Sequence, residues 1–161
     1  MGGALRGATV EVPGSGAALE GLLKHMEAAW PYEACGALFV SLSGQWTWQP
    51  IENVASCPRQ AFVFAEGWLG ILRKEEGQHR RLACLVHSHP GGEATLSAAD
   101  IQSLAPGGRW LWPEVMQMVV AVEKEGWKAL SWFKPRGAGF ECLGSFKRAC
   151  FEARKKEKFQ L

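Results

Sequence analysis

The sequence predicts a mixed α/β domain with a central β-sheet and helices packed against it. Its length of 161 residues is typical of one domain. Hydrophobic residues make up 47% of the chain and charged residues 21%, which provides enough apolar material for a buried core. Apolar runs of strand length alternate with segments whose apolar residues recur at helical spacing, and this alternation favours a sheet covered by helices.

Composition argues against several classes of protein. The formal net charge is +2, which is too small to indicate nucleic-acid binding by itself. No apolar run approaches the ~18 residues that cross a bilayer, and the first residues lack the apolar core of a signal peptide. The cysteines are odd in number and widely spaced, as free thiols in a reducing cytoplasm are. We therefore expect a cytoplasmic protein. The cysteines are Cys35, Cys57, Cys84, Cys142 and Cys150.

The N-terminal part of the chain predicts a strand, a helix and a hairpin. Residues 8–12 are typical of a short strand, and residues 16–30 follow as an amphipathic helix that Pro31 ends. Residues 34–40 form an apolar run of strand length, which predicts a strand buried on both faces. Residues 45–51 alternate polar and apolar positions after a Ser-Gly turn, as a second hairpin strand would. The apolar residues at helical spacing are Leu19, Leu22, Leu23, Met26 and Trp30.

The middle of the chain predicts a second buried strand between two helices. Residues 62–64 are expected to form a short strand, and residues 66–76 have the spacing of a helix. The apolar run 82–86 predicts a buried strand, which Pro90 and the glycines after it stop. Residues 97–104 are then expected to form a short helix.

The last third of the chain predicts a hairpin followed by a basic helix. Residues 116–122 and 127–133 form the hairpin, and residues 140–143 add one more strand. Residues 145–159 have a helical pattern with a net charge of +4, which is more often a solvated face than a nucleic-acid site. No repeat, linker or domain boundary interrupts residues 1–161, so one domain is expected. The charged residues of the helix are Lys147, Arg148, Glu152, Arg154, Lys155, Lys156, Glu157 and Lys158.

The most informative segment begins at the end of the buried strand 82–86. His87 and His89 stand two residues apart, so both imidazoles lie on one face of the extended chain and can reach one ion. Pro90 and two glycines turn the chain back, and Asp100 can return on the next helix as a third ligand. Two imidazoles and one carboxylate, with a fourth position left for water, are typical of catalytic rather than structural zinc.

A simpler interpretation exists for each part of this segment. A His-x-His pair alone has a high false-positive rate as a metal motif. Ser97 and Asp100 also match the Ser-x-x-Asp capping box that begins ordinary helices. The capping and metal-binding interpretations compete for Asp100, because a carboxylate bound to zinc cannot serve fully as a cap. The convergence of four such residues around one tight loop favours the metal site.

These residues resemble the signature of the JAMM metallopeptidases, also called MPN-positive or Mov34/PAD-1 proteins. The resemblance consists of His87-x-His89-Pro90, six residues, Ser97, two residues and Asp100. It extends upstream to Glu33, which lies in the segment Pro-Tyr-Glu-Ala-Cys-Gly, as in bacterial members. The resemblance implies a single JAB/MPN-type domain over residues 1–161, with a central mixed sheet flanked by helices in a cytidine-deaminase-like architecture.

The resemblance also implies a role for each of these residues. His87, His89 and Asp100 would bind Zn²⁺, with water in the open position. Glu33 would act as general base, and Ser97 would stabilise the oxyanion. Glu93 is a rival acid, but its Gly-rich turn predicts an exposed side chain. The remaining two histidines, His25 and His79, lie outside the group.

Members of this family hydrolyse peptide or isopeptide bonds after the C-terminal glycine of ubiquitin-like proteins. The short chain is most similar to small bacterial members, so the resemblance implies a ubiquitin-like or sulfur-carrier β-grasp protein ending in Gly-Gly as substrate. A deubiquitinase-like isopeptidase is therefore expected, and the sequence is compatible with an oligomer.

Alternatives from other classes remain open. A phage tail-associated endopeptidase would share the same fold and metal site. A metal-free MPN scaffold would act as a binding module, but here every ligand position is filled. A zinc nucleobase deaminase is disfavoured, because its His-x-Glu…Pro-Cys-x-x-Cys pattern is absent from the sequence.

Overall fold

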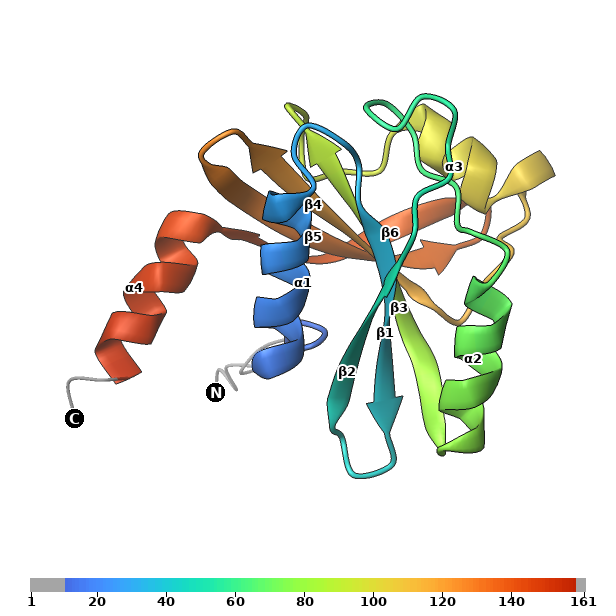
Figure 1. The fold of residues 1–161 in the computed structure, drawn as a ribbon, viewed down its shortest axis with the longest axis horizontal. Coiled ribbons are helices and arrows are strands. Elements are labelled where there is room, and N and C mark those ends of the chain that lie inside the picture. The colour runs from blue at the N-terminus through green and yellow to red at the C-terminus, as the bar shows by residue number, and fades with distance from the viewer. Residues whose placement is uncertain (1–10, 159–161) are drawn as a thin grey trace, which may run out of the picture.

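The computed structural model describes residues 11–158, which form a mixed six-stranded sheet with four α-helices (Figure 1). The strands lie in the order β2-β1-β3-β4-β5-β6. Neighbouring strands are antiparallel except for β3 and β4, which are parallel. The predicted α/β class with a central mixed sheet is therefore confirmed. The strands are β1 (Cys35–Ser41), β2 (Trp46–Ile51), β3 (Arg80–Pro90), β4 (Met116–Glu123), β5 (Gly126–Arg136) and β6 (Gly139–Lys147).

One face of the sheet is covered by α1 (Ala17–Ala28) and α4 (Arg148–Lys158). The helical spacing of apolar residues in α1 places one stripe against the strands, as predicted. This stripe joins the largest buried cluster, in which Leu38, Met118 and Trp132 are at most 1% exposed. The buried residues of α1 are Leu19, Leu22, Leu23 and Met26.

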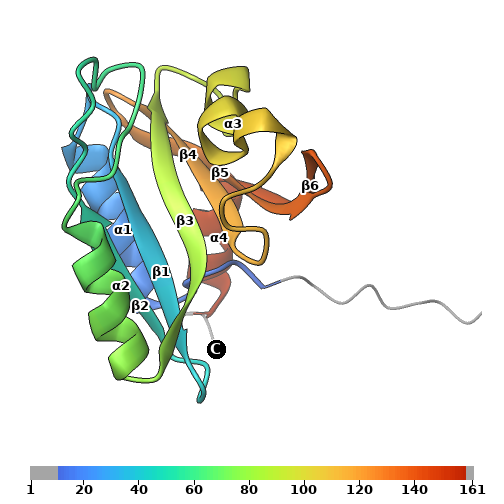
Figure 2. The same ribbon diagram turned by 90° about the vertical axis from the view of Figure 1, so that its right-hand side faces the viewer.

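The opposite face carries α2 (Trp68–Gly77) and α3 (Ala98–Leu104), and Figure 2 looks onto it. Each helix covers its own apolar cluster. The α2 cluster packs on β1, with Phe39 fully buried, whereas the α3 cluster packs on Val119 of β4 and Phe133 of β5. Because β3 lies between β1 and β4 in the sheet, its C-terminal end lies between these two helix-covered regions.

Several predicted boundaries need correction. Residues 8–10 of the first predicted strand lie outside the described residues, and residues 11–12 are not in a strand. The predicted strand 62–64 is reduced to an isolated bridge between Asn53 and Phe64. The helix expected over 145–159 begins only at Arg148, because residues 145–147 pair with β5 in the sheet; residue 159 is not described. Within residues 11–158, no helix is both long enough and apolar enough to cross a membrane.

Candidate metal centre

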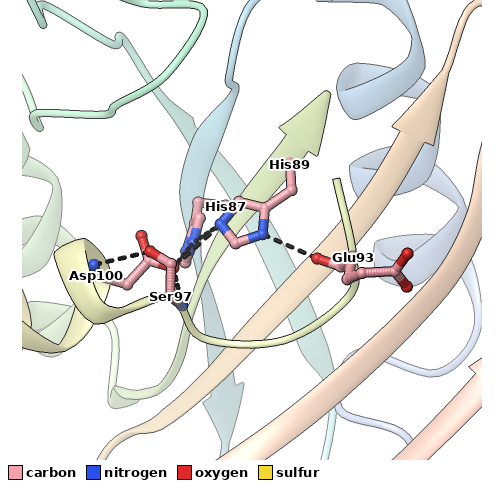
Figure 3. A network of polar contacts seen from close by, with 5 residues as sticks. All are labelled: His87, His89, Glu93, Ser97 and Asp100. Carbon is pink, nitrogen blue, oxygen red and sulfur yellow. Dashed lines mark hydrogen bonds and ion pairs between the residues drawn. The ribbon is translucent and has the colours of Figure 1, made fainter. Parts of the chain in front are cut away.

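The two predicted histidine ligands lie at the C-terminal end of β3. This strand is a rigid support, because its residues from Ala83 to Ser88 are all at most 3% exposed. His87 is 1% exposed and lies opposite Cys35 of β1, while His89 follows on the same face. Both side chains point toward the N-terminus of α3, as Figure 3 shows. The buried strand thus presents two imidazoles to the helix that carries Asp100.

Three candidate ligand atoms converge at this point. His87 Nε2 and His89 Nε2 are 3.0 Å apart, and Asp100 Oδ2 lies 3.3 Å from the first and 3.0 Å from the second. Nitrogen and oxygen ligands about 2.0–2.1 Å from one tetrahedral zinc ion would be ~3.3 Å from each other. The spacing of the three atoms therefore fits a single ion of this kind. His87, His89 and Asp100 together could hold a metal ion.

The protonation states of His87 and Asp100 suit a metal, whereas His89 must release a proton when it binds one. Burial alone would lower the pKa of His89, but hydrogen bonds to Asp100 and to the Glu93 backbone outweigh burial and raise that pKa. Burial lowers the pKa of His87, which keeps its imidazole neutral. Burial alone would raise the pKa of Asp100, but hydrogen bonds from His87 and His89 outweigh it and hold that pKa well below its ordinary value. Asp100 is therefore ionised. A neutral imidazole and an ionised carboxylate are the forms in which these side chains bind metal.

Contacts behind the ligand atoms fix the two imidazole rings. His89 Nδ1 lies 2.9 Å from the backbone oxygen of Glu93, so a proton on Nδ1 is donated there and Nε2 is left free for a metal. The ring of His87 stacks on Phe62, with centroids 4.3 Å apart and planes at 25°. Glu93 is exposed, as predicted, and its carboxylate points away from the site in Figure 3. It contributes its backbone and not its acid.

Asp100 and Ser97 form the predicted capping box at the start of α3. The Ser97 backbone N–H donates to Asp100 Oδ2 at 2.8 Å, and the Asp100 backbone N–H donates to Ser97 Oγ at 3.1 Å. The cap and the histidines therefore share one oxygen, Oδ2, so both interpretations of Asp100 find their contacts in the structure. Because Ser97 Oγ accepts its bond from the backbone, the hydroxyl keeps its own proton for donation.

Glu33 lies two residues before the start of β1 and close to His89 and Asp100. The register of β1 on β3 continues to Ala34, whose N–H donates to Ser88 Oγ at 2.8 Å and whose oxygen accepts from Ser88 N–H at 2.9 Å. The next pair along the strands is Glu33 and His89, and opposite residues of antiparallel strands project on the same face. Glu33 is not one of the three converging ligands.

The Glu33 carboxyl has the properties of a proton carrier. It is 7% exposed, and its Oε2 has no hydrogen-bond partner among residues 11–158. Burial raises the pKa of Glu33 to about 7. A carboxyl with a pKa near 7 can both accept and release a proton at neutral pH.

The two other histidines lie away from the site, as predicted. His25 is on α1 and packs on Trp48, with ring centroids 5.8 Å apart. His79 lies in the turn between α2 and β3, at the far end of β3 from His87, and has a positive φ of 57°.

Sequence reasoning missed three residues that support the site. Ser88 is fully buried and ties β3 to Ala34, while Asn53 and Phe62 contact Glu33 and His87. Ser88 had a usable signal, because a polar side chain inside an apolar strand requires a hydrogen-bond partner. Asn53 and Phe62 had none, since they come from an irregular segment.

A family model matches the larger part of the chain. Residues 16–132 match the family model described as prokaryotic homologs of the JAB domain, and this range contains all five predicted site residues. Curated proteins gave no significant match.

Three solved structures are similar to the chain. A protein from Desulfitobacterium hafniense has a TM-score of 0.62 and 21% identity, covering 78% of this chain and 84% of that one. A protein from Salinibacter ruber has a TM-score of 0.56 and 22% identity, with the same coverage of 78% and 84%. A JAB1/MPN domain protein from Archaeoglobus fulgidus has a TM-score of 0.43 and 18% identity, covering 79% and 90%. The first two show that the fold is shared.

Proposed function

We propose that this chain, which belongs to the family of prokaryotic homologues of the JAB domain, is a zinc-dependent peptidase. Its proposed substrate is a ubiquitin-like or sulfur-carrier β-grasp protein, cut after the C-terminal glycine. The observation that carries the proposal is the convergence of His87, His89 and Asp100 within 3.3 Å of one another, beside the buried carboxyl of Glu33. Three protein ligands with a proton acceptor next to them are typical of hydrolytic zinc sites.

His87, His89 and Asp100 would hold the zinc ion: their spacing fits it, and so do the neutral His87 and the ionised Asp100. Zinc bound there supplies a Lewis acid that lowers the pKa of water toward ~7. Hydrogen bonds to the rest of the chain keep two of the ligands in place. The backbone oxygen of Glu93 orients His89, and the capping box with Ser97 orients Asp100.

Glu33 moves the protons of the reaction. It accepts a proton from the attacking water as the bond forms between the water oxygen and the scissile carbonyl carbon. It then donates that proton to the amine nitrogen as the C–N bond breaks, which regenerates the carboxylate. Ser97 donates a hydrogen bond from its free hydroxyl to the carbonyl oxygen, where negative charge develops, and keeps its proton throughout. Glu33 thus carries the proton from the water to the leaving amine, and Ser97 stabilises the charge on the carbonyl oxygen.

The surface beside Glu33 supports a protein substrate. Tyr32, Val54 and Val63 are 48%, 49% and 52% exposed, and Val54 N–H donates to Val63 O at 2.9 Å. Exposed apolar side chains grouped at a site favour contact with a partner. Binding energy from the globular body of the partner would position the scissile bond, and glycine in its tail lets the backbone approach closely.

The test is cleavage of fusions to ubiquitin-like proteins taken from neighbouring genes, read by mass spectrometry. We expect one cut after the last glycine, stopped by chelator, and poor cleavage of free Gly-Gly peptides. A zinc-loaded protein that cuts an unrelated peptide but no such fusion would be a phage-type endopeptidase instead. A protein that binds no zinc and cuts nothing would be a binding scaffold.

Ser97→Ala separates the capping role of this residue from its proposed catalytic role. Loss of the N-cap should cost about 1 kcal/mol of unfolding free energy. Loss of the oxyanion donor should lower turnover of the fusion roughly 10²–10³-fold. Ser97→Asn and Ser97→Asp keep a capping side chain, so we expect them to recover stability in denaturant unfolding without recovering turnover. Recovery of both would make Ser97 a cap and nothing more.

A further inference from the structure

We propose that Asn53 is a positioning residue for Glu33, a role that rests on the function proposed above. Asn53 belongs to the segment 53–64, which joins β2 to α2 and is called the flap segment below. Through Asn53, the flap segment holds the backbone of Glu33 and places Phe62 against His87.

The side chain of Asn53 makes four hydrogen bonds. Its Nδ2 donates to the backbone oxygens of Glu33 at 2.9 Å and Ala61 at 3.0 Å. Its Oδ1 accepts from the backbone N–H groups of Ala55 and Val63, each at 3.0 Å. Both amide hydrogens and the amide oxygen are thereby used, and the two ends of the flap segment are tied to each other and to Glu33.

Glu33 depends on the flap segment because it lies outside the sheet. β1 begins at Cys35, and among the described residues the peptide groups on either side of Glu33 have a single contact with a strand, from Ala34 N–H to Ser88 Oγ of β3. Its backbone oxygen is bound by Asn53, and its backbone N–H donates to the oxygen of Pro58 at 2.7 Å. Both bonds come from the flap segment. A shift of this segment would therefore move the backbone from which the Glu33 carboxyl projects.

The same segment covers the metal centre. An isolated bridge pairs Asn53 with Phe64, and Phe64 packs on Trp68 of α2 with ring centroids 5.3 Å apart. Phe62 lies in the chain between the bridged residues Asn53 and Phe64, and its ring stacks on His87. Asn53 thus connects the proposed general base with the aromatic ring that covers one proposed ligand.

The test uses Asn53→Ala and Asn53→Asp. Alanine removes all four bonds, whereas aspartate keeps the size but turns an acceptor oxygen toward the carbonyls of Glu33 and Ala61. Gln49→Ala is the matched control. Gln49 lies on β2, and its side chain donates a part-buried hydrogen bond to Glu75 of α2 instead of to Glu33. Folding of each variant is checked by circular dichroism, and Asn53→Ser replaces any variant that does not fold.

Four quantities are measured: kcat and KM on the fusion substrate, zinc content, and amide hydrogen exchange at Glu33, Ala55 and Val63 in the metal-free protein. We expect the Asn53 variants to lower kcat ~10²-fold, since small misplacement of a catalytic group has that effect. KM should stay within about threefold and zinc content unchanged. All three amides should exchange at least ~10-fold faster in Asn53→Ala. In Asn53→Asp only the Glu33 amide should do so, because aspartate keeps an oxygen that accepts from Ala55 and Val63. Gln49→Ala should change none of these values.

Two results would overturn the proposal. Unchanged exchange at the three amides would mean that Asn53 does not hold Glu33. Faster exchange with an unchanged kcat would mean that holding Glu33 has no catalytic consequence. If the wild-type protein cleaves no fusion, the proposed function fails separately, and the exchange measurement still decides whether Asn53 fixes the backbone of Glu33.

Discussion

Glu33→Gln is expected to abolish cleavage while zinc stays bound. Glutamine has the size of glutamate but cannot accept a proton, so turnover of the fusion should fall at least ~10²-fold. Zinc content, measured by elemental analysis, should not change, because Glu33 is not among the three converging ligands. Loss of zinc in this variant would make Glu33 a ligand. Full activity would assign the proton transfer to another group.

The same variant tests the buried state of the Glu33 carboxyl in the metal-free protein. Burial raises its pKa from the ordinary value of 4.5 to about 7, so the folded chain keeps a proton that the unfolded chain has released. The stability of the wild type should therefore fall, relative to Glu33→Gln, as pH rises from 4.5 to about 7. The expected loss is about 3 kcal/mol. Parallel pH profiles of the two proteins would contradict a buried carboxyl.

Replacing both histidines by alanine is expected to remove the metal completely. The double variant His87→Ala, His89→Ala retains Asp100 alone, and one carboxylate does not form a tetrahedral zinc site. Zinc should fall from about one ion per chain to none, and cleavage of the fusion should disappear with it. Elemental analysis of protein purified without chelator provides the measurement.

His79→Asn is the matched control for this experiment. His79 lies at the far end of β3, and asparagine tolerates its positive φ of 57°. The control should keep its zinc and its activity. Equal zinc in the double variant and the wild type would place the metal elsewhere and remove the basis of the proposed function.

Much of the fold follows from local pattern. The stripe of apolar residues in α1 and the apolar runs of β1 and β3 each form the predicted element, because burial of one helix face or of both strand faces requires such patterns. Prediction failed at residues 145–147, where a helical pattern is overridden by pairing with β5. Cross-strand partners far away in sequence decide such cases.

In the candidate site, too, some residues could be predicted from local pattern and others could not. His87 and His89 were predictable because their spacing on one strand fixes their common face. Asp100 was predictable because a tight turn and a capping box return it to that strand. Asn53 and Phe62 were not, because the flap segment is irregular and its position depends on contacts with Glu33 and α2 that no local pattern encodes.

The central claim is that metal held by these three side chains drives peptide cleavage. The most direct measurement is a zinc titration of chelator-treated wild-type protein, followed by cleavage of the fusion at each step. We predict no cleavage without metal, a rise in proportion to added zinc, and a plateau at about one ion per chain. Cleavage that persists in the metal-free protein, or a plateau that the double histidine variant also reaches, would contradict the claim.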